Sequence, residues 1–287
     1  MGGMLPADSP ATPIVLGAVL LGLLAMLAIR AALKDRQEYR RFKALDDTAA
    51  RQRVMRRWLL ESALMFGGAS LVVLPLVWRF VPLLLEEIHS YPWVSAARAA
   101  FLSSGALGPA LAWGTGILVV GGSLLAIVLA RDSTHVPTVG DISALLPRNR
   151  PELLLGAALS LNAGVMEELL FRLALPALVY GVCGNAAVAV IASVVLFGVL
   201  HLYQGAWGVL ASMLTGGILM LLYLATGSIL VPIALHALFD LRSLVVIPVV
   251  VFKVHRKDGR PEPRPEEHLE DHAEERPEER PEERLEP

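Results

Sequence analysis

The chain has 287 residues, of which 55% are hydrophobic and only 18% charged, with a formal net charge of −2. A soluble domain carries about 25% charged and 45–50% apolar residues, so the composition excludes an ordinary soluble enzyme and indicates a protein of the lipid bilayer. The sequence has no basic patch interleaved with aromatic residues, and nucleic acid is not an expected partner. Cys183 is the single cysteine, which excludes an intramolecular disulfide.

The apolar residues gather into runs long enough to cross a membrane, for which a helix needs about 20 residues. In chain order, the predicted spans cover residues 13–30, 58–80, 107–130, 152–180, 185–203, 206–226 and 228–252. No Lys or Arg precedes Arg30, so the first run lacks the basic segment of a signal peptide and is expected to be retained. The expected fold class is all-α: a polytopic transmembrane bundle of about seven helices with a disordered, charged C-terminal tail.

The connections between the spans predict the orientation. Residues 30–57 are expected to form a loop, and its basic residues are Arg30, Lys34, Arg36, Arg40, Arg41, Lys43, Arg51, Arg53, Arg56 and Arg57. By the positive-inside rule this loop is cytoplasmic, which places the N-terminus outside and the C-terminal tail inside. The connection 81–106 then lies outside, and its apolar content leaves an additional half-helix open. This topology, without a retention signal, fits a bacterial cell membrane.

Three of the apolar segments carry polar side chains. They are Met166-Glu167-Glu168-Leu169-Leu170-Phe171-Arg172, Phe197-Gly198-Val199-Leu200-His201 and His236-Ala237-Leu238-Phe239-Asp240. A charged side chain at the bilayer centre costs about 2.5–3.5 kcal/mol on insertion scales. Such residues therefore face the interior of a bundle and usually carry function.

The two adjacent glutamates are expected to have different roles. Neighbouring helix positions point about 100° apart, and Glu168 and Arg172 have the i,i+4 spacing that favours an ion pair. Glu168 is then held by Arg172, and Glu167 is free to act as a general base. The alternative is a structural cluster in which the three charges neutralise one another.

The histidines are expected to lie near Glu167. His236 and Asp240 share one helix face, and an imidazole can accept a proton, donate one to an oxyanion or bind a metal. A single membrane histidine can also be a satisfied core residue. A rise of about 1.5 Å per residue places Glu167, His201, His236 and Asp240 in a common layer, mostly in the cytoplasmic half of the membrane.

These ordered motifs resemble the CPBP family, which comprises CAAX proteases and Abi-like, bacteriocin-processing proteins. The resemblance covers roughly residues 150–250. It implies that Glu167 and His201 activate a water, and that His236 and residue 240 bind the oxyanion or a metal. Eukaryotic members have Asn where this chain has Asp240. An ionised Asp only accepts hydrogen bonds, which favours metal ligation or orientation of His236 over a simple oxyanion-hole role.

The resemblance predicts an intramembrane endopeptidase with the catalytic residues Glu167, Glu168, Arg172, His201, His236 and Asp240. Zinc is left open, with His201, His236, Asp240 and Glu167 as candidate ligands; the helical zinc motif His-Glu-x-x-His is absent. The alternative mechanism is a metal-free, glutamate-dependent one. The expected partners are the lipid bilayer and a peptide or membrane-protein substrate. The sequence does not decide whether that substrate carries a lipid. Two alternative functions are considered beside the protease. The protein could be a proton-coupled transporter, or a catalytically idle membrane scaffold or immunity protein.

Four regions are therefore expected. Residues 1–57 form an N-terminal transmembrane helix and basic loop, and residues 58–150 hold two further transmembrane helices. Residues 151–252 form the CPBP-like catalytic core. Residues 253–287 repeat Arg-Pro-Glu-Glu and lack the apolar residues for a packed core, so they are expected to be disordered.

Overall fold

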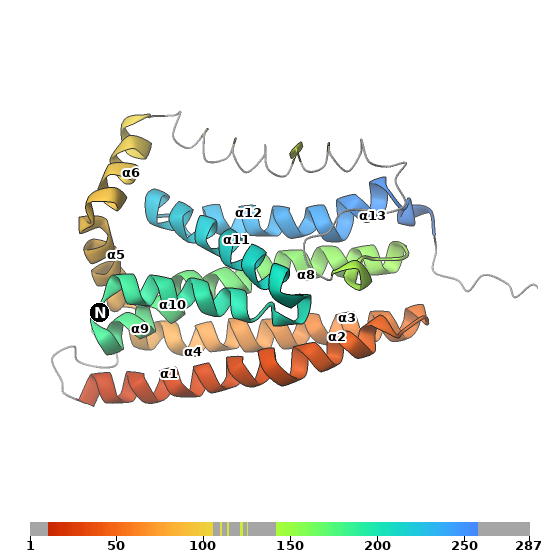
Figure 1. The fold of residues 1–287 in the computed structure, drawn as a ribbon, viewed down its shortest axis with the longest axis horizontal. Coiled ribbons are helices and arrows are strands. Elements are labelled where there is room, and N and C mark those ends of the chain that lie inside the picture. The colour runs from red at the N-terminus through yellow and green to blue at the C-terminus, as the bar shows by residue number, and fades with distance from the viewer. Residues whose placement is uncertain are drawn as a thin grey trace, which may run out of the picture.

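The computed structural model describes residues 11–105 and 142–257, together with positions 110, 114, 121, 122 and 125. Within these residues every regular element is helical, which confirms the all-α prediction (Figure 1). The α-helices are α1 (Ala11–Ile29), α2 (Asp35–Lys43), α3 (Thr48–Ser62), α4 (Gly68–Val77), α5 (Phe80–Ser90), α6 (Pro92–Ser103), α8 (Arg150–Glu168), α9 (Leu175–Cys183), α10 (Ala186–Val199), α11 (Gly205–Thr226), α12 (Leu230–Leu241) and α13 (Ile247–Val250).

In the described part of the chain, five continuous helical stretches are long and apolar enough to cross a membrane. They are Ala11–Lys43, Thr48–Val77, Arg150–Cys183, Leu202–Thr226 and Leu230–Val250, and Ala186–Val199 is a shorter apolar helix. The expected count of about seven is therefore approximate. The predicted span 107–130 lies almost wholly outside the described residues, as does the tail from residue 258 onward.

The prediction of a loop at residues 30–57 is wrong. A π-helical turn, Arg30–Lys34, joins α1 directly to α2, and α3 begins at Thr48. The side chain of Asp47 starts α3 by accepting hydrogen bonds from the amides of Ala49 and Ala50, as N-cap residues do. Hydropathy assigned the segment to a loop because it is highly charged. Its helix is amphipathic, however, and buries Tyr39 and Phe42 on one face.

The connection 81–106 also contains helices, namely most of α5 and all of α6, which resolves the half-helix that the sequence left open. Pro92 lies in the first turn of α6, where its missing N–H costs no hydrogen bond. In Figure 1, α5 and α6 run across one end of the long helices.

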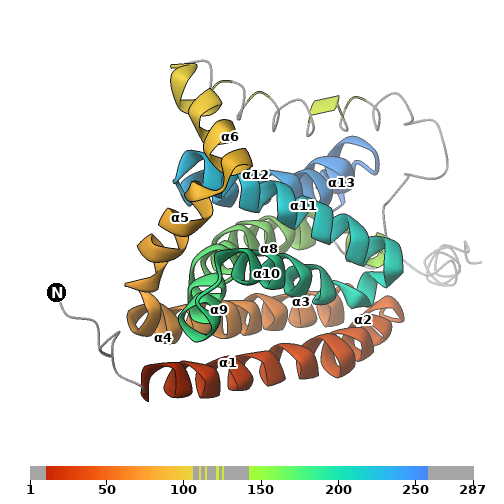
Figure 2. The ribbon, with the colours of Figure 1, turned by 60° about the vertical axis from the view of Figure 1, so that its left-hand side comes forward.

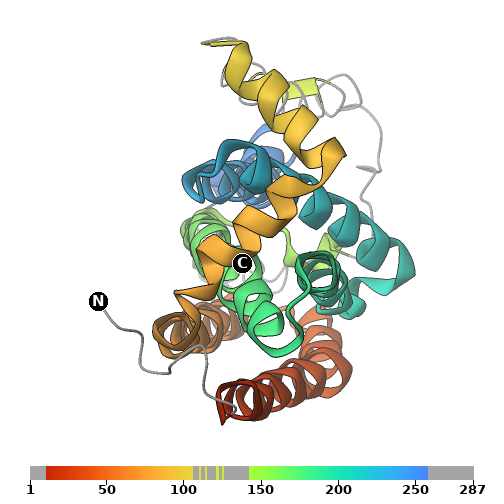
Figure 3. The same cartoon turned by 90° about the vertical axis from the view of Figure 1, so that its left-hand side faces the viewer.

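Helix α8 lies at the centre of the bundle. It packs against α3 on one side and α12 on the other, while α10 packs against α9 and α11. Figure 2 shows the order of these helices from the side, and Figure 3 shows it almost end-on. The polar motif of α8 is therefore surrounded by protein rather than lipid.

Two π-helical turns interrupt the membrane helices near the polar motifs. Leu169–Ala174 joins α8 to α9 and contains Arg172, and Arg242–Val246 follows α12. Each precedes a proline, Pro176 or Pro248, by two residues. A proline cannot donate the hydrogen bond of a regular helix, and a π-helical turn accommodates that loss. Such turns frequently occur at functional sites.

A buried ion pair joins α3 to α8 away from these motifs. Nη2 of Arg51 lies 3.2 Å from Oε2 of Glu152, and both side chains are fully buried. Glu152 also accepts hydrogen bonds from Thr48 and Asn149, and the Asn149 side chain caps α8 by accepting from the Glu152 amide at 3.0 Å. Nη1 of Arg51 is buried without a hydrogen-bond partner among the described residues, but the ion pair and the other hydrogen bonds of this cluster join α3 to α8.

Candidate active site

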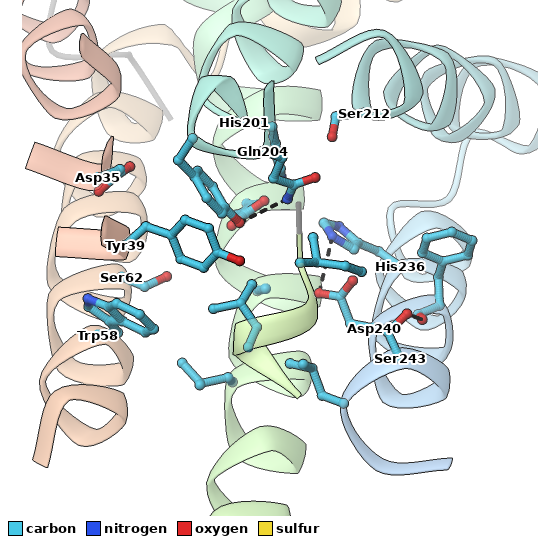
Figure 4. Close-up of a pocket in the computed structure, with 18 of the residues that line it drawn as sticks. Asp35, Tyr39, Trp58, Ser62, His201, Gln204, Ser212, His236, Asp240 and Ser243 are labelled. Carbon is cyan, nitrogen blue, oxygen red and sulfur yellow. Dashed lines mark hydrogen bonds and ion pairs between the residues drawn. The ribbon is translucent and has the colours of Figure 1, made fainter. Parts of the chain in front are cut away.

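A cavity of about 380 Å³ opens among α2, α3, α8, α11 and α12. Four of the predicted site residues line it: Glu167, His201, His236 and Asp240. They come from α8, the turn after α10, and α12. In Figure 4, His236 and Asp240 face the cavity from one side, and Tyr39 of α2 faces them from the other.

Glu168 and Arg172 lie behind the cavity wall and do not line it. Oε2 of Glu168 is 3.0 Å from Nε of Arg172, an ion pair whose two atoms are not aligned for a hydrogen bond. Nη2 of Arg172 donates to the carbonyl of Gly216 at 3.3 Å, and its guanidinium lies 4.8 Å from the ring centroid of Phe197. The i,i+4 pair expected from the sequence is therefore present, and it is almost completely buried.

The other oxygen of Glu168 connects α8 to α12. Oε1 lies 2.7 Å from Nδ1 of His236. Because a carboxylate oxygen accepts, Nδ1 of the ring carries the hydrogen in this contact. Nε2 of His236 lies 3.7 Å from Oδ2 of Asp240, which is close enough for an ion pair if the ring is charged but longer than a hydrogen bond. The imidazole is thus held at one nitrogen and turned toward Asp240 at the other.

Glu167 differs from its neighbour in both position and partners. It lines the cavity and forms no ion pair or hydrogen bond with any residue that the structure describes. The angle of about 100° between adjacent helix positions accounts for the difference. Glu168 contacts Arg172 and His236 through its two carboxylate oxygens. Glu167 can instead bind a ligand in the cavity.

His201 is fixed in one tautomer by its own turn. Its Nδ1 lies 2.9 Å from the carbonyl oxygen of Phe197. A carbonyl only accepts, so Nδ1 carries the hydrogen and Nε2 of the neutral ring has a free lone pair. The ring of Phe197 lies between the two histidines, with centroids 5.0 Å from His201 and 5.9 Å from His236.

Several cavity residues were missed by the sequence prediction. Nε2 of Gln204 donates to the hydroxyl oxygen of Tyr203 at 2.9 Å, and the Tyr203 ring stacks on His201 with centroids 6.1 Å apart. Tyr203 and Gln204 follow His201 by two and three positions. The sequence could have indicated them, because polar side chains are unusual near the end of an apolar span. Tyr39 and Trp58 also line the cavity. They come from α2 and α3, and nothing in the motif pattern pointed to them.

The zinc site that the sequence left open does not fit this arrangement. Among residues 11–105 and 142–257, no three His, Cys, Asp or Glu side chains are gathered as metal ligands. Catalytic zinc commonly has three protein ligands and a water. Nδ1 of each histidine is bonded to a protein oxygen, so Nε2 is the ring nitrogen that is left for a ligand. These side chains can transfer protons to a ligand in the cavity and form hydrogen bonds with it.

A match to a known protein family covers the segment that contains the three polar motifs. Residues 149–242 match the family model described as Type II CAAX prenyl endopeptidase Rce1-like. The matched segment contains α8 to α12 and all six predicted site residues. The helices that form the opposite wall of the cavity, α2 and α3, lie outside it. No curated protein and no solved structure matches the chain.

Proposed function

Residues 149–242 belong to the CPBP family of intramembrane proteases, and on this premise we propose that the cavity hydrolyses a peptide bond with a water activated by Glu167 and His201. The observation that carries the proposal is that the Glu167 carboxylate and Nε2 of His201 line one cavity and have no hydrogen-bond partner among residues 11–105 and 142–257. A base and an acceptor facing one space can bind both hydrogens of a single water.

The proposed reaction needs only these protein groups. Glu167 takes a proton from the water while Nε2 of His201 accepts a hydrogen bond from the other O–H. The hydroxide oxygen adds to the peptide carbonyl carbon, and the carbonyl oxygen becomes an oxyanion. Glu167 then gives its proton to the peptide nitrogen as the C–N bond breaks, leaving a carboxylic acid and an amine. General acid–base catalysis of this kind contributes about 10²–10⁴-fold in rate.

His236 is the proposed oxyanion donor. Protonated on both nitrogens, its ring donates from Nδ1 to Glu168 and from Nε2 into the cavity. Asp240 lies beside Nε2 and, when ionised, only accepts, so its proposed role is to orient and stabilise the ring. Arg172 balances the buried charge of Glu168. We therefore assign Glu168, Arg172 and Asp240 as positioning residues.

The protein is an integral membrane protease of the CAAX type, and its substrate is a peptide or protein in the membrane. The proposed side of access is cytoplasmic. Helices α2 and α3 form one wall of the cavity and carry the basic residues that mark a cytoplasmic face. The assignment to a bacterial membrane is likewise a proposal.

Cleavage of a peptide panel tests this proposal. The purified protein in detergent is given prenylated and unlipidated peptides with C-terminal CAAX-type sequences. We expect Glu167→Gln to lower cleavage by about 10²-fold or more, and Glu86→Gln, at an exposed position of α5, to leave it unchanged. Undiminished cleavage by Glu167→Gln would overturn the mechanism. Inhibition by a zinc chelator, reversed by added zinc, would overturn its metal-free form.

A further inference from the structure

The side chain of Tyr39 links α2 to the turn that carries His201. Its ring meets that of Tyr203 edge-on, with centroids 5.3 Å apart and an angle of 63° between the planes. The Tyr203 ring in turn stacks on His201, with centroids 6.1 Å apart and 28° between the planes. Tyr39 is almost completely buried and lines the cavity, and Figure 4 shows it extending from α2 into that space. Three rings therefore form a continuous row from α2 to the proposed water-binding histidine.

His201 needs support from outside its own segment. Glu167 and His236 lie within α8 and α12, whereas His201 lies in the connection between α10 and α11. Side chains on connecting segments are held less precisely than those on helices. The bond from Nδ1 of His201 to the Phe197 carbonyl is local and does not tie the turn to another helix. The short helical turn that follows, Leu202–Gln204, packs against α2 as well as against α11.

Helix α2 is itself fixed in the bundle and can act as this support. The ring of Phe42 packs on Trp58 of α3, with centroids 4.7 Å apart. Nε1 of Trp58 donates to Oε2 of Glu38 at 2.8 Å, which makes a second link between α2 and α3. The buried ion pair described above then joins α3 to α8. The position of the Tyr39 ring is therefore set, through α3, relative to the helix that carries the proposed general base.

We propose that Tyr39 is a positioning residue for the hydrolysis: its ring holds Tyr203 against His201, so that Nε2 of His201 stays directed at the cavity. This inference rests on the proposed protease function. It makes α2, which lies outside the family-matched residues 149–242, a necessary part of the site. An edge-on contact depends on the aromatic ring and not on its hydroxyl. Loss of the ring should lower kcat by about 2- to 10-fold and change KM little, because Tyr39 acts on His201 rather than on the substrate.

The kinetics of five variants test this role. Cleavage of one peptide gives kcat and KM for Tyr39→Leu, Tyr39→Phe, Tyr203→Leu, the double variant of Tyr39→Leu with Tyr203→Leu, and Phe80→Leu. Phe80 is a buried residue of α5 that is not among the described residues lining the cavity, so its variant controls for the loss of a buried ring. We expect Tyr39→Phe and Phe80→Leu to keep the wild-type kcat, and Tyr39→Leu to lower it.

The double variant shows whether Tyr39 acts through Tyr203. If it does, the double variant should be no slower than Tyr203→Leu alone, because residues that act as one unit are not additive. Four results would each overturn the proposal: an unchanged kcat in Tyr39→Leu, an equal loss in Tyr39→Phe, losses that multiply in the double variant, or a change confined to KM.

A spectroscopic measurement keeps the test independent of cleavage. The histidine rings are isotopically labelled for NMR, and comparison with His201→Gln identifies the signals of His201. We expect Tyr39→Leu to shift these signals, because the ring stacked on His201 moves, and Tyr39→Phe and Phe80→Leu to leave them in place. Unshifted signals in Tyr39→Leu overturn the proposal. If no form of the protein cleaves a peptide, the wild type included, the protease function fails, and the His201 signals still decide whether Tyr39 positions the ring.

Discussion

Oε1 of Glu168 lies 2.7 Å from Nδ1 of His236, so a carboxylate of α8 holds an imidazole of α12 at the wall of the cavity. The same carboxylate faces Arg172 through its second oxygen. One buried side chain therefore sets the position of the proposed oxyanion donor and neutralises a buried cation. Its neighbour Glu167 holds no other described side chain in place. Substitutions of the two glutamates are therefore expected to differ in their effect on stability.

Changing either glutamate to glutamine separates these roles. Both Glu167→Gln and Glu168→Gln should abolish most cleavage, but only Glu168→Gln should destabilise the fold. Breaking a buried pair by removing one partner costs about 3–5 kcal/mol, because the other charge stays buried. Thermal unfolding in detergent measures the difference. Equal unfolding temperatures for the two variants would show that Glu168 does not hold Arg172 and His236 in the folded protein.

The close approach of α8 and α12 depends on a glycine. A Cβ at Gly164 would lie 2.8 Å from Cβ and 2.9 Å from the backbone N of Ala237, the residue after His236. Gly164→Ala should therefore separate the helices, costing about 1–3 kcal/mol, and lower activity by moving His236 away from Glu167.

Gly68→Ala in α4 is the matched control. A Cβ at Gly68 would meet nothing within 4 Å, so this change should keep both stability and activity. Unfolding temperature and kcat/KM are measured for both variants. A Gly164→Ala protein that unfolds and cleaves like the wild type would contradict the packing argument.

Tyr203 offers a second hydrogen-bond donor in the cavity. Its oxygen accepts from Gln204, which leaves its own hydrogen free to donate. If that hydrogen contacts the developing oxyanion, Tyr203→Phe should lower kcat and change KM little. The decrease in kcat should reach at most about 10²–10³-fold, the effect of losing one oxyanion donor. Tyr91→Phe, in the turn between α5 and α6, is the control. A change confined to KM would assign Tyr203 to substrate binding instead.

A pH effect is expected at one end of the bundle. Oε1 of Glu87 accepts a hydrogen bond from the Ala186 amide at 3.0 Å, at the start of α10. This bond holds the pKa of Glu87 below its usual value of 4.5. The carboxylate is favoured in the folded state, so its stabilising effect is present above pH 4.5 and is lost as the pH falls through the lower, folded-state pKa.

Unfolding temperatures between pH 6 and pH 3 measure this effect. The stability of the wild type should fall more steeply with acidification than that of Glu87→Gln, whose side chain does not titrate. The difference should be modest because Glu87 is partly exposed. Parallel pH curves for the two proteins would show that this helix cap contributes no pH-dependent stability.

Sequence patterns were sufficient for features that lie within one helix. The apolar runs predicted a helical membrane protein, and the spacing of Glu168 and Arg172 predicted their ion pair. Both follow from the fixed rise and rotation of an α-helix, which hold whatever the helix packs against. The same reasoning failed at residues 30–57, because charge alone does not distinguish a loop from an amphipathic helix that buries Tyr39 and Phe42.

Contacts between helices were decided only by the tertiary structure. Glu168 and His236 are 68 positions apart, and their contact depends on how closely α8 approaches α12 at Gly164. Packing also places α2 and α3 as the opposite wall of the cavity. A helical repeat fixes which residues share a face, but the distance between two faces is set by the side chains that meet between them.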